Sequence, residues 1–174
     1  MGYLQFYLFD QRTEAIDAYK QALCLAPEDL AIRSNILALH ILDPEYRSVT
    51  DNEFETVVSE HPASGVALLE ALRAIVRENF GEASSAFQRA LVSNDPEVFN
   101  TYRGFFVLFL RLVALQNYGD KLLRFLEEQG LSERYWPIYA ALDAYVYGKE
   151  RLMDVNPEVR GVATHIYVWL DSSR

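Results

Sequence analysis

Apolar residues recur along this chain at the three- and four-residue spacing that places them on one face of an α-helix. No stretch alternates apolar and polar residues convincingly as a strand would, and no hairpin dipeptide such as Asn-Gly or Asp-Gly occurs. The pattern therefore predicts an all-α protein. The predicted helices cover residues 2–9, 13–25, 28–42, 51–60, 64–79, 81–92, 96–116, 119–129, 132–147 and 157–170.

Proline followed by glutamate marks several of the predicted helix starts. Proline suits the first helical position because its missing N–H would have had no partner there, and glutamate suits the positive end of the helix dipole. The connections between predicted helices are short, which favours antiparallel neighbours. The Pro-Glu pairs are Pro27-Glu28, Pro44-Glu45, Pro96-Glu97 and Pro157-Glu158.

A longer spacing recurs on top of the helical one. Small residue, aromatic residue, small residue and proline are separated by 4, 3 and 5 positions in the first copy, and its aromatic residue lies 35 residues before the next one, which lies 33 before the third. A fourth copy begins with "NYGDKLLRF", which parallels "NFGEASSAF" 38 residues earlier. The repeated positions are Ala15, Tyr19, Ala22 and Pro27, then Thr50, Phe54, Val57 and Pro62, then Ala83, Phe87, Ala90 and Asp95, and finally Phe125.

Self-similarity near 34 residues with this signature resembles the tetratricopeptide repeat family. The resemblance implies a right-handed α-solenoid of antiparallel helix hairpins, in which small residues let helices approach and the aromatic residue fills the space between hairpins. It divides the chain into one repeat domain with a C-terminal capping helix, and the short first unit suggests the C-terminal part of a longer protein. The expected units are residues 1–29, 30–63, 64–95, 96–130 and 131–174.

Charge and hydropathy narrow the kinds of partner that the protein is expected to bind. The net charge of −9 opposes binding to a phosphate backbone, so we expect no nucleic-acid partner. The apolar stretch "GFFVLFLRLVAL" is interrupted by Arg111 and is shorter than the roughly 20 residues of a membrane-spanning helix. Because "MGYLQFYLFD" lacks a basic leader, we expect a cytoplasmic protein without a membrane partner.

Residues that carry catalysis or bind metals are not grouped along the chain. Cys24 is the one cysteine, and its apolar neighbours predict a small buried side chain. His40, His61 and His165 lie far apart without the spacing of a metal site, and there is no glycine-rich phosphate loop. We therefore expect a protein that is not an enzyme and has no catalytic, cofactor-binding or metal-binding residues, the alternative being an active site assembled only in three dimensions.

The family resemblance implies binding of a protein or peptide segment in a concave groove lined by the first helix of each hairpin. Such a groove would be apolar with few polar groups, as in helix-in-groove recognition. The competing interpretation of each candidate residue is packing between hairpins. A further alternative is a regulatory or substrate-recruiting domain of a larger enzyme or signalling protein. The apolar helix at 98–116 is either wrapped by neighbouring hairpins or buried in a homo-oligomer. The candidate partner-binding residues are Asn35, Ala38, Leu69, Tyr102, Arg103 and Phe106.

Overall fold

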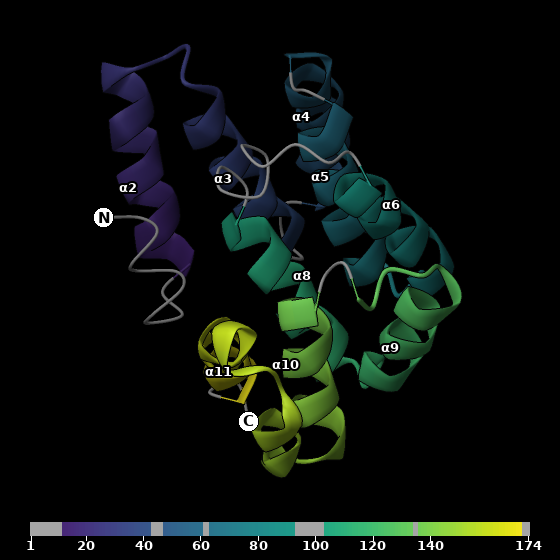
Figure 1. The fold of residues 1–174 in the computed structure, drawn as a ribbon. Coiled ribbons are helices and arrows are strands. Elements are labelled where there is room, and N and C mark those ends of the chain that lie inside the picture. Colours follow the sequence, from purple (N-terminus) through teal and green to yellow (C-terminus); the bar gives the residue numbers. More distant parts are fainter. Residues whose placement is uncertain (1–11, 43–46, 61–62, 93–102, 134–135, 172–174) are drawn as a thin grey trace.

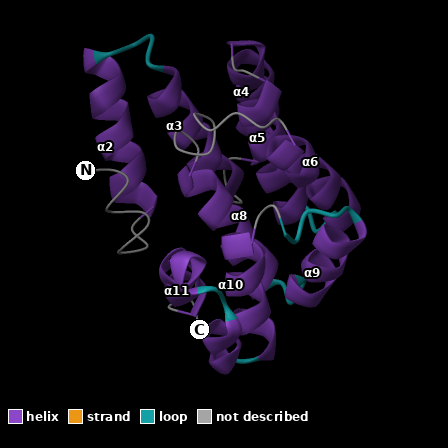
Figure 2. Ribbon diagram, in the orientation of Figure 1, coloured by secondary structure: helices purple, strands orange, loops and turns teal. Residues whose placement is uncertain are grey.

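The structure, a computed structural model, describes residues 12–42, 47–60, 63–92, 103–133 and 136–171. These residues form helices joined by short turns and contain no strand (Figure 2). The all-α prediction is confirmed for this part of the chain. The helices are α2 (Arg12–Leu25), α3 (Leu30–Leu42), α4 (Arg47–Glu60), α5 (Ala63–Val76), α6 (Phe80–Val92), α8 (Arg103–Leu115), α9 (Gly119–Glu128), α10 (Trp136–Tyr147) and α11 (Pro157–Asp171), with a 3₁₀ helix, η2, at Lys149–Asp154.

Most described boundaries agree with the sequence prediction to within a few residues, and the difference at the start of α3 has a local cause. Helix α3 begins at Leu30 and not at residue 28, because Asp29 Oδ1 accepts hydrogen bonds from the backbone N–H groups of Ala31 and Ile32 and so caps the helix. The 3₁₀ helix η2 was not predicted. The expected helix at 2–9 lies outside the described residues.

Helices adjacent in sequence pack in pairs, and the pairs are joined through α3, α5 and α8 (Figure 1). The α5–α6 pair has the most extensive contact, and α10–α11 comes next. Helix α3 contacts α2, α4 and α5, while α8 contacts α5, α9 and α11. In the described part of the chain, every helix is too short or too polar to cross a lipid bilayer.

The centre of the core is a cluster of phenylalanine rings between α6 and α8. Phe87 stacks on Phe109 with ring centroids 4.3 Å apart and meets Phe106 edge-on at 5.7 Å. Ala83 and Ala90, on the same side of α6 as Phe87, are also buried. Of the four repeat copies, the third therefore has its small and aromatic positions fully inside the core.

The other repeat positions are buried to differing degrees. In the first copy Ala15 is buried, Tyr19 and Ala22 are half-buried, and Pro27 is exposed in the turn after α2. Phe54 is buried on α4 with the Arg73 guanidinium 3.8 Å from its ring centroid. Pro62 lies outside the described residues.

Helix α8 is the apolar helix for which two environments were considered. Seven of its side chains are buried within this chain, and Leu115 at its end is exposed. Its described side chains are thus largely covered by neighbouring helices. The buried set is Phe105, Phe106, Leu108, Phe109, Leu110, Val113 and Ala114.

Helices α5, α8 and α9 end in the same kind of turn. In each, one residue adopts a left-handed backbone, with φ of 60° at Glu78, 58° at Asn117 and 65° at Gly130. The N–H groups of that residue and the next one bond back to carbonyls of the last helical turn, as in the Schellman motif. These turns end each helix, and after α5 and α8 three residues lead to the next helix.

The fourth repeat copy is shifted by one residue between sequence and structure. "NFG" and "NYG" align at a distance of 38 residues, but the left-handed residues Glu78 and Asn117 are 39 apart (117 − 78). At the structural distance Leu126 corresponds to Phe87, and Leu126 is fully buried whereas Phe125 is only partly buried. The turn geometry, and not the Asn-aromatic-Gly sequence, sets which side of α9 faces the core.

Candidate functional site

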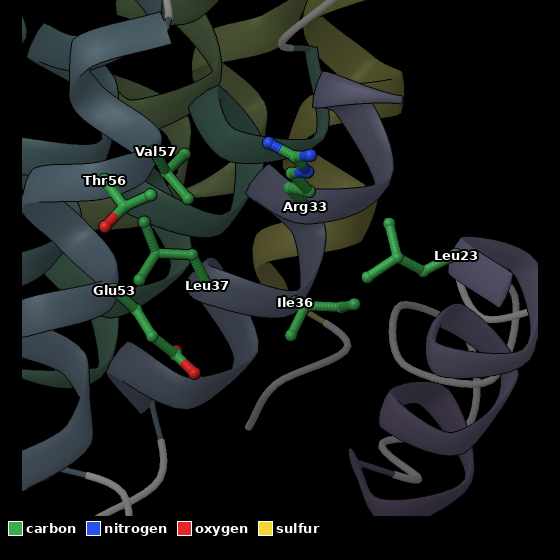
Figure 3. Close-up of a pocket in the computed structure, with 7 residues that line it drawn as sticks. All are labelled: Leu23, Arg33, Ile36, Leu37, Glu53, Thr56 and Val57. Carbon is green, nitrogen blue, oxygen red and sulfur yellow. The ribbon is translucent and has the colours of Figure 1, made fainter. Parts of the chain in front are cut away.

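An open groove of about 630 Å³ lies between α2 and α4, with α3 as its floor (Figure 3). Figure 1 shows α2 and α4 on either side of α3, and both contact it. We call it the α2–α4 groove. Its lining residues are Leu23, Arg33, Ile36, Leu37, Glu53, Thr56 and Val57.

Helical spacing explains how these side chains converge. Residues 33, 36 and 37 share one face of α3, and residues 53, 56 and 57 share one face of α4, because positions three and four apart are neighbours on a helix surface. Figure 3 shows Leu23 on the α2 side and Val57 with Thr56 on the α4 side. Leu37 and Val57 are buried beneath the groove, while Leu23 and Ile36 are half-buried and present apolar surface to it.

The end of the groove near the start of α3 is held by Arg33. Its Nε and Nη2 donate to the carbonyl of Pro27 at 3.0 and 2.9 Å, and Nη2 lies 3.3 Å from Glu28 Oε2. The guanidinium therefore ties α3 to the α2–α3 turn. Its positive charge is already matched by the carboxylate of Glu28.

Glu53 gives the other end of the groove its charge. Oε2 of Glu53 lies 2.8 Å from Nδ1 of His40, and since an ionised carboxylate can only accept, the histidine donates. The His40 ring is buried, whereas the Glu53 side chain is 39% exposed. One side of the carboxylate thus anchors α4 to α3 and the exposed side faces solvent.

A second polar cluster joins α9 to α10. The Tyr139 hydroxyl donates to Glu127, the Tyr147 hydroxyl donates to Asp120, and Arg124 pairs with Asp120 within α9. Burial, followed by the hydrogen bond to Glu127, raises the pKa of Tyr139. The hydrogen bond to Asp120 is the first cause of the raised pKa of Tyr147. Both phenols therefore stay protonated and keep donating at neutral pH.

Asp143 completes this cluster on α10. Burial raises its pKa, the neighbouring Glu127 raises it further, and Arg151, whose Nε lies 3.9 Å from Asp143 Oδ2, lowers it. A hollow of about 380 Å³ at this end of the helix pair touches Asp120, Gly119 and Tyr145. The carboxylates bond to phenols and guanidinium groups of the same chain, so the cluster is best explained as a clamp between two helices.

The predicted partner-binding residues that the structure describes do not form a common open surface. Ala38, Leu69 and Phe106 are 2%, 0% and 3% exposed and belong to the core. The Asn35 side-chain amide donates to the Ala31 carbonyl one turn earlier on the same helix, at 2.7 Å. Tyr102 and the side chain of Arg103 lie outside the described residues.

Cys24 corrects another expectation. It was predicted to be a small buried residue, but its side chain is exposed near the end of α2. Apolar neighbours in the sequence suggested burial, yet Leu25 beside it is 89% exposed. The side of α2 near its start is covered instead, since Ala15 and Ile16 are buried.

The lining of the α2–α4 groove was not predicted from the sequence. Leu23, Ile36 and Val57 follow the same helical periodicity as core residues, so the pattern does not distinguish them from fully covered side chains. Partial exposure depends on how far α2 and α4 stand apart, which no local pattern encodes.

Among the described residues, no group of three or more His, Cys, Asp or Glu side chains is arranged to hold a metal ion.

Comparison of the chain with protein-family models, with curated proteins and with solved structures found no match. The resemblance to tetratricopeptide repeats thus rests on the spacing of the residues named above.

Proposed function

We propose that this chain is a non-catalytic interaction module that binds a segment of another protein in the α2–α4 groove. The observation that carries the proposal is the groove itself, about 630 Å³ of open space over half-buried Leu23 and Ile36. Concave sites of this size, lined by apolar side chains with a few polar groups at defined places, are typical binding sites.

The proposed architecture is a stack of tetratricopeptide-like hairpins. The pairing of α3 with α4, α5 with α6 and α10 with α11 supports it, as do the contacts that join α3 to α5 and α5 to α8. In such a stack a groove between the second helices of neighbouring hairpins is a surface on which a partner can lie. The proposed site is on this side, because Ala38, Leu69 and Phe106 are covered by neighbouring helices.

The proposal is tested by selecting binders from a phage-displayed library of random peptides and measuring the selected peptides by fluorescence anisotropy. Leu23→Gln should weaken their binding about tenfold, because burying one leucine side chain is worth roughly 1.5–3 kcal/mol. Leu25→Gln is the matched control, since Leu25 lies two residues away and outside the groove lining. It should bind as the wild type does.

Thermal unfolding of both variants checks that neither change disrupts α2. If no peptide is enriched, or if the selected peptides bind Leu23→Gln and the wild type equally, this groove is not the binding site.

A further inference from the structure

The two charged residues that line the α2–α4 groove differ in what they can offer a ligand. Arg33 is bound to the Pro27 carbonyl and paired with Glu28 at 3.3 Å, so its charge is matched within the chain. Glu53 has a histidine on one oxygen and 39% of its side chain exposed. A carboxylate has about four acceptor positions, which leaves Glu53 able to accept from a ligand.

The net charge of the chain has the same sign as that of Glu53. The whole chain carries a net charge of −9 at neutral pH. An acidic ligand would meet repulsion both at long range and at the groove, whereas a basic one would be attracted and could pair with Glu53.

The distance between the apolar and the acidic parts of the groove is one helical turn. Glu53 and Val57 are four residues apart on α4, and one turn advances about 5.4 Å along the axis. A ligand that fits would carry an apolar side chain and a basic side chain about one turn apart.

The arrangement of the three helices favours a helical ligand. Helices that pack directly have axes about 8–10 Å apart. Because α2 and α4 lie on opposite sides of α3 and the groove opens between them, a helix laid over Ile36 would contact all three (Figures 1 and 3). This is the helix-in-groove mode, with anchors at positions i, i+3 or i+4, and i+7.

Building on the proposed function, we infer that the occupant of the α2–α4 groove is a basic amphipathic helix of a partner protein. Its apolar face lies on the half-buried Leu23 and Ile36, above the buried Val57, and a lysine or arginine one turn away pairs with the Glu53 carboxylate. Charge complementarity and the one-turn spacing set this class of ligand apart from acidic or neutral helices.

The test uses three fluorescein-labelled 18-residue helical peptides that share one leucine stripe and differ in their flanking residues, which are lysine, glutamine or glutamate. Binding to the full chain is measured by anisotropy at 0.15 M salt, where the Debye length is about 8 Å and long-range attraction is screened. The lysine peptide should bind about tenfold or more tightly than the glutamate peptide.

The Glu53→Gln variant tests whether the preference for the lysine peptide arises at Glu53. The glutamine side chain keeps an oxygen for His40 but removes the charge, so binding of the lysine peptide should weaken about two- to fivefold, as for a partly exposed ion pair. Binding of the glutamine peptide should not change. Glu128→Gln, at an exposed position on α9, removes the same charge elsewhere and should leave both affinities unchanged.

The outcomes separate this inference from the proposed function. Equal binding of all three peptides, or an equal effect of Glu53→Gln and Glu128→Gln, would overturn the basic ligand. If Leu23→Gln still weakens binding in that case, the groove remains the binding site. Failure of all three peptides to bind the wild type would overturn the basic helix, and an unproductive library selection would then overturn the groove as well.

Discussion

The size of the side chain at position 90 determines how closely α6 can pack against its neighbours. Its side chain is 3% exposed, and the α5–α6 pair is the most extensive helix contact in the described part of the chain. Ala83 and Phe87 on the same side of the helix are also buried. Side-chain volume at these positions therefore acts directly on the distance between helices.

Ala90→Leu should destabilise the protein by about 1–3 kcal/mol, because the added atoms must displace packed neighbours. Ser85→Leu puts the same side chain on the exposed face of α6 and should change stability by less than about 0.5 kcal/mol. Urea unfolding followed by circular dichroism measures both. A neutral Ala90→Leu would mean that α6 does not pack as described.

The sequence pattern indicated which single side chains are buried where the repeat signature is strong. The spacing of Ala83, Phe87 and Ala90 indicated three interhelical positions, and all three are buried. The same reasoning failed at Cys24, because apolar neighbours in sequence do not show whether another helix covers that end of α2.

At the scale of the element, Gly119 shows how a turn positions a helix. A Cβ at Gly119 would lie 2.6 Å from Cγ2 of Val146, so the absence of a side chain lets the start of α9 approach α10. Gly81, which is its counterpart in the sequence parallel, has Asn79 Oδ1 as its nearest neighbour at 3.9 Å. Two glycines in similar sequences thus have different roles.

Gly119→Ala should cost about 1–3 kcal/mol, since Val146 is β-branched and cannot easily rotate away. Gly81→Ala should instead stabilise the protein by up to about 1 kcal/mol, because alanine fits the helix and restricts the unfolded chain. Thermal unfolding of the pair tests this. Equal behaviour of the two variants would show that α9 does not make this contact with α10.

At the scale of the whole molecule, α8 joins the N-terminal and C-terminal helices. It contacts α5 on one side and α9 and α11 on the other, and Phe109 stacks on Phe87 of α6 at 4.3 Å. The two tryptophans of the chain, Trp136 and Trp169, both lie in the α10–α11 pair. Tryptophan fluorescence therefore reports the C-terminal pair, while far-ultraviolet circular dichroism reports all helices.

Phe109→Ala should destabilise the protein by about 3–5 kcal/mol and separate the unfolding midpoints seen by these two signals, which coincide for a two-state protein. The loss of this ring weakens the connection between the two halves more than it weakens α10–α11. Phe125→Ala, at a half-buried site on α9, should cost less and keep the midpoints together. Coincident midpoints in Phe109→Ala would contradict the role given to α8.

The sequence by itself determined the all-α class and most helix boundaries, because apolar periodicity, capping residues and prolines act over a few neighbouring residues. It also indicated the core side of α6. Only the tertiary structure decided that Leu126 and not Phe125 takes the fully buried place on α9, and that Leu23 and Ile36 line an open groove while Ala38 and Leu69 are covered. Those outcomes depend on the separation and rotation of whole helices, which arise from many weak contacts between residues far apart in the chain.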